Sequence, residues 1–221
     1  MTTVACRLHP ALIERLNRLA AGPRRLLGVV GPPGAGKSTL AALLADALGE
    51  RAQAVPMDGY HLAQVELERL GRAQRKGAPD TFDAAGYAAL LQRLRHQRTD
   101  ETVYAPDFRR EIEEPVAGAL PVFAHTPLVI SEGNYLLLPD AAWEPVTRLF
   151  DEIWYLQVDP ALRLSRLTER HMRFGRTREQ ATAWIESNDE PNARVIEASA
   201  HRAHLQVQWN DGTGLFETLP G

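Results

Sequence analysis

The stretch Gly31-Pro32-Pro33-Gly34-Ala35-Gly36-Lys37-Ser38 decides the fold of this 221-residue chain. Its spacing is G-x-x-x-x-G-K-S, and it lies between an apolar run at 26–30 and an Ala- and Leu-rich run at 39–48. Glycines in such a loop let backbone N–H groups turn inward around the phosphates of a nucleoside triphosphate, where a Cβ would clash. The alternative is a glycine turn that only joins a strand to a helix. Lys37 and Ser38, in register after an apolar strand, favour a phosphate-binding loop, or P-loop.

The polar residues of the P-loop have predicted tasks. Lys37 brings a mobile positive charge to the β and γ phosphates, and Ser38 offers a hydroxyl ligand to Mg²⁺. We therefore expect a nucleoside triphosphate with Mg²⁺ as the cofactors. The residues of this segment predicted to bind the nucleotide are Gly31, Gly34, Ala35, Gly36, Lys37, Ser38 and Thr39.

The rest of the chain alternates strand-like and helix-like stretches, which predicts an α/β P-loop NTPase fold with a parallel sheet flanked by helices. The stretch 70–118 breaks this rhythm, so we predict an insertion over the strand ends, on the substrate side. The stretch 160–200 is predicted to form a helical lid, with a Thr177–Gln180 capping box after a break at Phe174-Gly175. The five predicted strands are 26–30, 52–57, 127–130, 153–158 and 205–209.

The composition limits the classes of partner. The formal net charge is -3 with acidic and basic residues interspersed, so no general attraction to nucleic acid or to an anionic membrane is expected. A hydrophobic content of 44% can fill one sizeable core, and we expect a single domain over 1–221. The lone Cys6 allows no internal disulfide, and no run of about 18 apolar residues occurs. These features predict a soluble cytoplasmic protein, whose state as a monomer or homodimer stays open.

A P-loop serves kinases, GTPases and motors alike, so other features must choose among them. The chain has no Asn-Lys-x-Asp segment to recognise guanine and no transporter-type Leu-Ser-Gly-Gly signature. The leading prediction is therefore an ATP-dependent kinase that phosphorylates a hydroxyl of a small metabolite. The alternative is a regulatory or chaperone-like P-loop NTPase that acts through a protein partner.

Two carboxylates follow predicted strands. Asp58 comes after the run 52–57, at the edge of the sheet where the γ phosphate is expected, and it can accept a proton from an attacking hydroxyl. Its alternative is a structural Asp-Gly turn. Glu132 follows the third strand, in the place of the carboxylate that steadies Mg²⁺, and its alternative is to orient the turn that follows it. We predict Asp58 as the catalytic base, and Ser38 with Glu132 as the metal ligands.

Arginines recur on one face of the late helices. Because their spacing is three, four and three residues, they share a helical face that can close on the triphosphate and stabilise charge on the transferred phosphoryl group. The alternative is a solvated basic face neutralised by nearby glutamates. With Lys37, we predict Arg170 and Arg173 to be catalytic and Arg176 to bind nucleotide. The arginines of this region are Arg163, Arg166, Arg170, Arg173 and Arg176.

Over residues 26–198 these segments resemble the kinase superfamily of uridine kinase, phosphoribulokinase and bacterial pantothenate kinase. The resemblance is to the bacterial subgroup assigned to fructose-transport systems in particular. It implies that the Asp of the first segment is the catalytic base, that the last segment lies near the nucleotide, with Asn192 in contact, and that ATP is the donor. The segments that carry the resemblance are Met57-Asp58-Gly59-Tyr60-His61, Lys76-Gly77-Ala78-Pro79-Asp80-Thr81-Phe82-Asp83, Val129-Ile130-Ser131-Glu132-Gly133 and Asn188-Asp189-Glu190-Pro191-Asn192-Ala193.

The acceptor is not identified by sequence. Uridine kinases carry an Asp in place of Gly77, which counts against uridine here. Aromatic residues in this region are as readily packing residues as ligand contacts. The resemblance places Tyr104, Asp107 and Arg109 in the stretch that contacts the acceptor. We also predict Tyr60 and His61 to bind the substrate, and the alternative for His61 is a polar residue satisfied within the fold.

Overall fold

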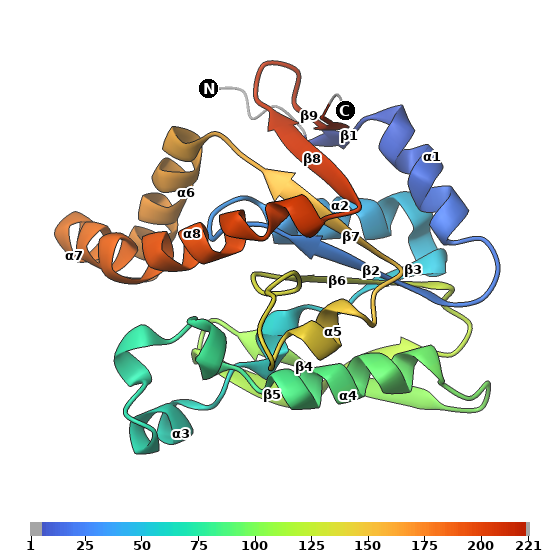
Figure 1. The fold of residues 1–221 in the computed structure, drawn as a ribbon, viewed down its shortest axis with the longest axis horizontal. Coiled ribbons are helices and arrows are strands. Elements are labelled where there is room, and N and C mark those ends of the chain that lie inside the picture. Colours follow the sequence, from blue (N-terminus) through green and yellow to red (C-terminus); the bar gives the residue numbers. More distant parts are fainter. Residues whose placement is uncertain (1–5, 220–221) are drawn as a thin grey trace.

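The computed structural model describes residues 6–219, so the ends of the predicted 1–221 domain lie outside the described residues. A twisted central sheet carries helices on both faces, and a separate hairpin lies beside α4 (Figure 1). In spatial order the sheet consists of β1 (Arg7–Leu8), β9 (Leu215–Thr218), β8 (Leu205–Asn210), β7 (Glu152–Gln157), β2 (Arg25–Val30), β6 (Leu128–Gly133) and β3 (Ala52–Ala54).

The five predicted strands form the continuous parallel part of this sheet, from β8 to β3. The predicted total of five is wrong, because β9 pairs antiparallel with β8, and β1 pairs with β9. The Asn210 side chain accepts hydrogen bonds from the N–H groups of Gly212 and Thr213, which closes the turn between β8 and β9. The two residues of β1 are too few to show a period-two pattern.

The predicted strand 52–57 is also too long. β3 ends at Ala54, and a short 3-10 helix, Met57–Tyr60, follows it. Pro56 has no N–H to donate to a neighbouring strand, which helps to end the pairing here. Asp58 is therefore presented by a helical turn after the strand and not by the strand end itself.

The helices surround the sheet, and the predicted capping box is confirmed. The Thr177 hydroxyl accepts from the Gln180 N–H, and the Gln180 side chain accepts from the Thr177 N–H. A π-helical turn, Ile185–Asp189, joins α7 to α8. Within 6–219 no helix is both long and apolar enough to cross a membrane. The helices are α1 (Pro10–Leu19), α2 (Lys37–Leu48), α3 (Gln64–Arg69), α4 (Ala84–Arg95), α5 (Glu144–Thr147), α6 (Pro160–Arg173), α7 (Arg178–Trp184) and α8 (Glu190–Ala198).

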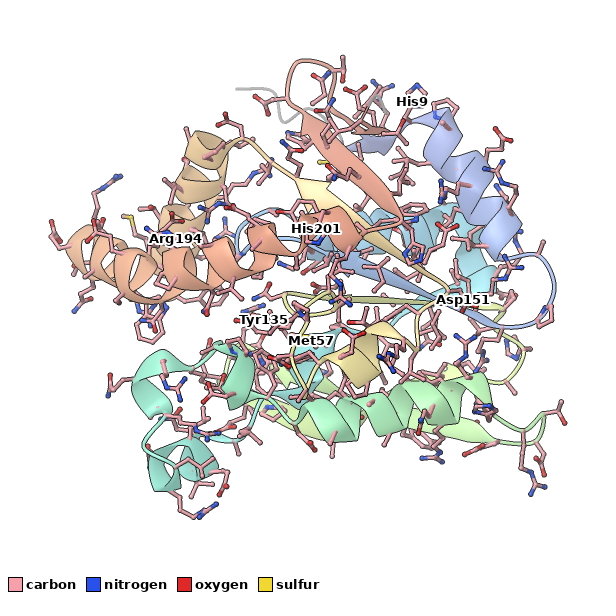
Figure 2. All side chains as sticks on the ribbon, viewed as in Figure 1. His9, Met57, Tyr135, Asp151, Arg194 and His201 are labelled. Atoms are coloured by element: carbon pink, nitrogen blue, oxygen red, sulfur yellow. The ribbon has the colours of Figure 1, made fainter. Side chains whose placement is uncertain are left out.

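Strand β2 has core on both sides. Leu27 and Val29 pack in the cluster with α1 and α2, whereas Leu26 and Val30 pack in the cluster with α4 and the insertion. Burial on both faces explains why the strand is continuously apolar. Met57 belongs to the second cluster and lies near the centre of the molecule (Figure 2).

The insertion contains α4 and one antiparallel hairpin, β4 (Thr102–Arg109) and β5 (Glu114–Phe123), and α3 directly precedes it in the chain. The two short strand-like segments expected at 103–104 and 112–116 are therefore parts of a longer hairpin, which extends beyond the predicted boundary at 118. Its pairing register shifts between Ala105 and Asp107. The insertion brings its own residues to the same cavity as the P-loop.

Candidate active site

The P-loop is held by two glycines and by helix α6. Gly34 and Gly36 have φ values of 82° and 97°, a region that favours glycine, and α2 begins at the next residue, Lys37. A Cβ on Gly34 would lie 2.7 Å from Leu167 Cγ and 2.9 Å from the Arg163 carbonyl oxygen. The loop therefore needs glycine both for its own turn and for its contact with α6.

Lys37 is buried beneath this loop, and its side chain lies among four charged groups, Glu132, Asp58, Arg170 and Arg110. Its Nζ donates to the Pro32 carbonyl oxygen at 3.2 Å. Burial lowers the pKa of Lys37 to about 8, and the negative charges of Glu132 and Asp58 oppose that shift. The ammonium group is thus desolvated in advance, and a phosphate would replace the water that it has lost.

Ser38 and Glu132 lie in direct contact. The Ser38 hydroxyl donates to Glu132 Oε1 at 2.7 Å, and Glu132 lies within β6. Burial raises the pKa of Glu132, and the charge of Asp58 adds to this effect, whereas Lys37 and the Ser38 hydrogen bond oppose it. A hydroxyl and a carboxylate at this spacing form a pair of hard oxygen donors.

Asp58 faces the same cavity from the turn after β3. Its Oδ2 accepts from Arg110 at 3.1 Å, and its side chain is 27% exposed. The next residue must be small, because a Cβ on Gly59 would overlap the carbonyl group of Pro106 in the hairpin. The two residues of the Asp-Gly pair therefore have different roles. Gly59 allows the hairpin to pack closely against this turn, and the side chain of Asp58 lines the cavity.

These residues border one cavity of about 490 Å³ between the P-loop, the insertion and the late helices. A second hollow of about 340 Å³ lies against the outer side of the P-loop. Lys37, Ser38 and Arg170 line both, so the two spaces meet at these residues. The second hollow is also lined by Gly34, Gly36, Thr39, Arg166, Glu169 and Arg173.

The late arginines do not form a uniform basic face. Arg163 is buried, pairs with Glu190 and donates to the Pro33 carbonyl oxygen at 3.4 Å, so it fastens α6 to the P-loop and to α8. Arg170 makes no ion pair within residues 6–219. Burial lowers the pKa of Arg170, and Asp189 opposes the shift. Arg170 is thus a desolvated cation facing both cavities.

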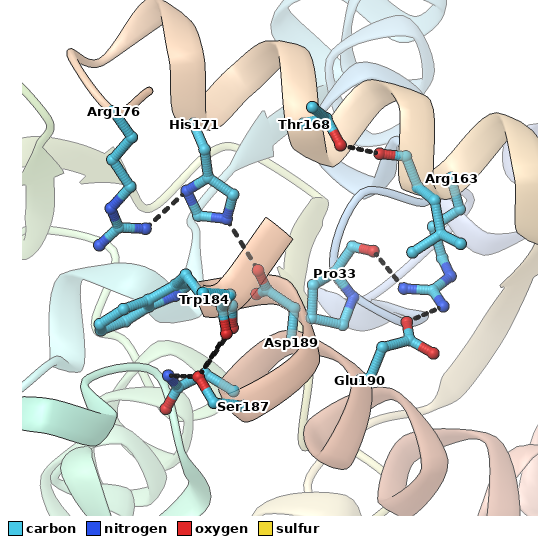
Figure 3. A network of polar contacts seen from close by, with 12 residues as sticks. Pro33, Arg163, Thr168, His171, Arg176, Trp184, Ser187, Asp189 and Glu190 are labelled. Atoms are coloured by element: carbon cyan, nitrogen blue, oxygen red, sulfur yellow. Dashed lines mark hydrogen bonds and ion pairs between the residues drawn. The ribbon is translucent and has the colours of Figure 1, made fainter. Parts of the chain in front are cut away.

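A chain of hydrogen bonds links the C-terminal end of α6 to the π-helical turn between α7 and α8 (Figure 3). Arg176 Nη1 donates to His171 Nδ1 at 2.8 Å, so Nε2 carries the ring proton and donates to Asp189 Oδ2 at 2.8 Å. The Arg176 guanidinium also lies 4.0 Å from the ring centroid of Trp184. All four residues line the main cavity, as does the predicted nucleotide contact Asn192.

The predicted acceptor residues are only partly brought together. His61 lines the cavity, between Phe82 and Phe108 at ring-centroid distances of 4.0 and 4.7 Å. Tyr60 packs on Tyr87 in the core instead. Tyr104 is 59% exposed, and Asp107 pairs with Arg109 at 3.5 Å, and none of these three residues borders the cavity.

Sequence reasoning missed two cations of this region, Lys76 and Arg110, which do line the cavity. The sequence could have indicated Lys76, because it is the first residue of one of the segments that carry the family resemblance. The sequence could not have indicated Arg110 in preference to its neighbour Arg109. Strand β4 ends at Arg109, and only the structure shows that Arg110, directly after the strand, faces the cavity.

Comparisons with known proteins show the family of this chain. The model of the "Phosphoribulokinase / Uridine kinase family" matches residues 26–212. A candidate uridine kinase of Schizosaccharomyces pombe is 37% identical over 196 residues, covering 84% of this chain and 83% of that protein. The uncharacterised protein YggC of Escherichia coli K12 is 33% identical over 212 residues, covering 92% and 87%. The crystal structure of a candidate fructose transport system kinase from Silicibacter sp. TM1040 has a TM-score of 0.81 and 40% identity, covering 89% of this chain and 97% of that one.

Proposed function

The chain belongs to the phosphoribulokinase and uridine kinase family of ATP-dependent P-loop kinases, and from this premise we propose that it transfers the γ-phosphoryl group of ATP to a hydroxyl of a small metabolite. One observation carries the proposal. A carboxylate outside the P-loop, Asp58, shares a cavity with Lys37 and Arg170, so a proton acceptor and two phosphate-binding cations face one space.

In the proposed reaction Asp58 takes the proton of the acceptor hydroxyl as its oxygen attacks the γ phosphorus. The new O–P bond forms as the bond between the γ phosphorus and the β–γ bridging oxygen breaks, and ADP leaves with that electron pair. Arg110 holds the Asp58 carboxylate in place in the free protein. The products are ADP and a phosphate monoester of the acceptor.

Lys37 and Arg170 would stabilise the charge on the transferred group. Both side chains are desolvated, so their attraction to phosphate oxygens exceeds that of the same groups in water. Arg173 lines the hollow outside the P-loop, and Arg176 is fixed by His171 and Trp184, so we propose both as phosphate contacts of the closed lid.

The residues present fit a magnesium ion carried by the nucleotide. Ser38 Oγ and Glu132 Oε1 are 2.7 Å apart, and Mg²⁺ in such sites takes one or two protein oxygens and fills its other positions with phosphate and water. Ser38 and Glu132 would hold the ion. When bound, Mg²⁺ neutralises charge on the β and γ phosphates.

The test is ADP release with Mg²⁺ and ATP across a panel of sugars, nucleosides, pantothenate and other hydroxylated metabolites, with Lys37→Ala as the blank. We expect one acceptor class to accelerate ADP release and to yield an equal amount of phosphorylated product. Slow, Lys37-dependent hydrolysis that no acceptor stimulates but that a protein partner accelerates would instead support the regulatory NTPase.

A further inference from the structure

The chain contains only two lysines, and both line the main cavity. Its other basic side chains apart from histidine are arginines, most of them outside this cavity. Lys37 has its task at the nucleotide phosphates. Lys76 lies on the insertion side of the same cavity, where the proposed function places the acceptor.

Lys76 and Arg110 gather around one aromatic ring. Lys76 Nζ is 5.5 Å and the Arg110 guanidinium carbon 5.8 Å from the centroid of Phe108. Lys76 also donates to the carbonyl oxygen of Glu113 at 2.5 Å, and Glu113 has a left-handed φ of 53° at the end of the hairpin. The hairpin thus carries Arg110 directly after β4, and it holds Lys76 through the carbonyl oxygen of Glu113.

The two cations differ in their counterions, because only Lys76 lacks a carboxylate partner within residues 6–219. Within residues 6–219 no carboxylate oxygen lies within 4.0 Å of Lys76 Nζ, whereas Arg110 pairs with Asp58. Glu113 lines the cavity as well, and its charge acts on Arg170. Burial lowers the pKa of His61, so this neighbour is neutral at neutral pH. A positive charge in a cavity without its counterion is a binding site for an anion.

We propose that Lys76 and Arg110 bind an anionic group of the acceptor, a carboxylate or a phosphate monoester, so that the substrate is an acidic alcohol and not a neutral sugar or nucleoside. The inference rests on the proposed kinase function, which it deepens. The same two side chains fit either anion, because lysine acts as a point charge and arginine can donate two parallel hydrogen bonds to carboxylate or phosphate oxygens.

The binding test uses the fact that there are two lysines. Reductive methylation with ¹³C-formaldehyde keeps the charge and labels only Lys37, Lys76 and the N-terminal amine, and Lys76→Arg assigns the Lys76 signal. The nucleotide site is filled with MgADP, and two series of probes are titrated, each with a neutral alcohol, a carboxylate and a phosphate monoester. One series is sorbitol, gluconate and sorbitol 6-phosphate, and the other is glycerol, glycerate and glycerol 3-phosphate. We expect a saturable shift of the Lys76 signal with anionic probes only, and the carboxylate and phosphate arms tell which anion is preferred. No shift with any anion, or an equal shift with the neutral probes, would overturn the inference.

The kinetic test compares the same neutral and anionic acceptors. Lys76→Met and Arg110→Met keep much of the packing on Phe108, and each should raise KM for an anionic acceptor about 10- to 100-fold, the loss of one charged hydrogen bond. KM for ATP should not change, and Arg98→Met, an exposed arginine paired with Asp100, is the matched control. If neutral acceptors are phosphorylated, and each variant changes KM equally for neutral and anionic acceptors, the anion subsite is rejected but the kinase function stands. If no acceptor is phosphorylated, the kinase fails, and the methyl-lysine titration still decides whether Lys76 binds anions.

Discussion

Three charged residues that are far apart in the chain define the centre of the site. Lys37, Asp58 and Glu132 come from α2, from the turn after β3 and from β6, and each changes the proton affinity of another. Burial alone would favour the neutral forms of Lys37 and Glu132, and their mutual attraction favours the charged forms. A nucleotide and a cation would add charge to this balance, so proton binding and ligand binding are coupled here.

The base assignment gives the first prediction at the residue scale. Asp58→Asn keeps the shape of the side chain but cannot accept the hydroxyl proton, so kcat with a true acceptor should fall about 100-fold or more, with KM for ATP little changed. Steady-state kinetics in both substrates measures this. Near-normal kcat in the variant would show that Asp58 is only a turn residue.

The lowered pKa of Lys37 predicts a pH dependence of nucleotide affinity. Phosphate binds the charged ammonium, so in metal-free buffer the affinity for ADP should be constant below the pKa of about 8. It should then fall as the pH rises above that value, by about tenfold per pH unit at most. Calorimetric titration from pH 7 to 9.5 measures it, above the phosphate pKa of about 6. Lys37→Met should bind ADP weakly with no such slope, and an equal slope in that variant would contradict the assignment to Lys37.

Gly59 predicts an effect on stability. Gly59→Ala places a Cβ against the Pro106 carbonyl, so the hairpin must move, at a cost of about 1–3 kcal/mol in the free energy of unfolding. The matched control is Gly212→Ala, where the nearest atom to the added Cβ is Asn210 Oδ1 at 3.4 Å. Urea unfolding compares the two variants, and equal stability would show that the contact yields without cost.

At the scale of elements, the lid depends on how its short helices begin and end. Helix α7 has only seven residues, so its capping box provides a large part of its local stability. Thr177→Ala should lower the free energy of unfolding by about 0.5–2 kcal/mol, because it removes the N-cap hydroxyl. It should speed amide hydrogen exchange in 178–184, whereas Thr182→Ala, in the exposed middle of the same helix, should not. Unchanged exchange in Thr177→Ala would mean that packing alone holds α7.

Elements of the insertion and of the sheet meet in shared packing. Phe82, Tyr87, Tyr135 and Trp143 belong to one core cluster with strand residues such as Leu26 and Val129. The Tyr87 hydroxyl and the Ser131 hydroxyl are 2.6 Å apart, which joins α4 to β6. Because this packing crosses the boundary of the insertion, the insertion should not unfold on its own.

The whole molecule is therefore predicted to unfold as one unit. Far-UV circular dichroism and tryptophan fluorescence should give coincident urea transitions, because the core on one side of the sheet contains both insertion and strand residues. MgADP should shift both transitions together. Two separated transitions would show that the insertion is an independent unit and would reject the single-domain prediction.

The sequence by itself determined the P-loop, the five parallel strands at the core of the fold, the capping box and the family, because these features depend on local spacing and on runs of apolar residues. It could not determine the seven-stranded sheet, since β1 and β9 are short edge strands whose partners lie far away in the chain. Nor could it separate Arg109 from Arg110, or Tyr104 from Phe108, because the facing of a hairpin residue is set by where the hairpin docks. Only the tertiary structure brought Lys76 and Arg110 to the cavity with Asp58. Contacts between charged residues that are far apart in the chain leave no regular spacing in the sequence from which they could be predicted.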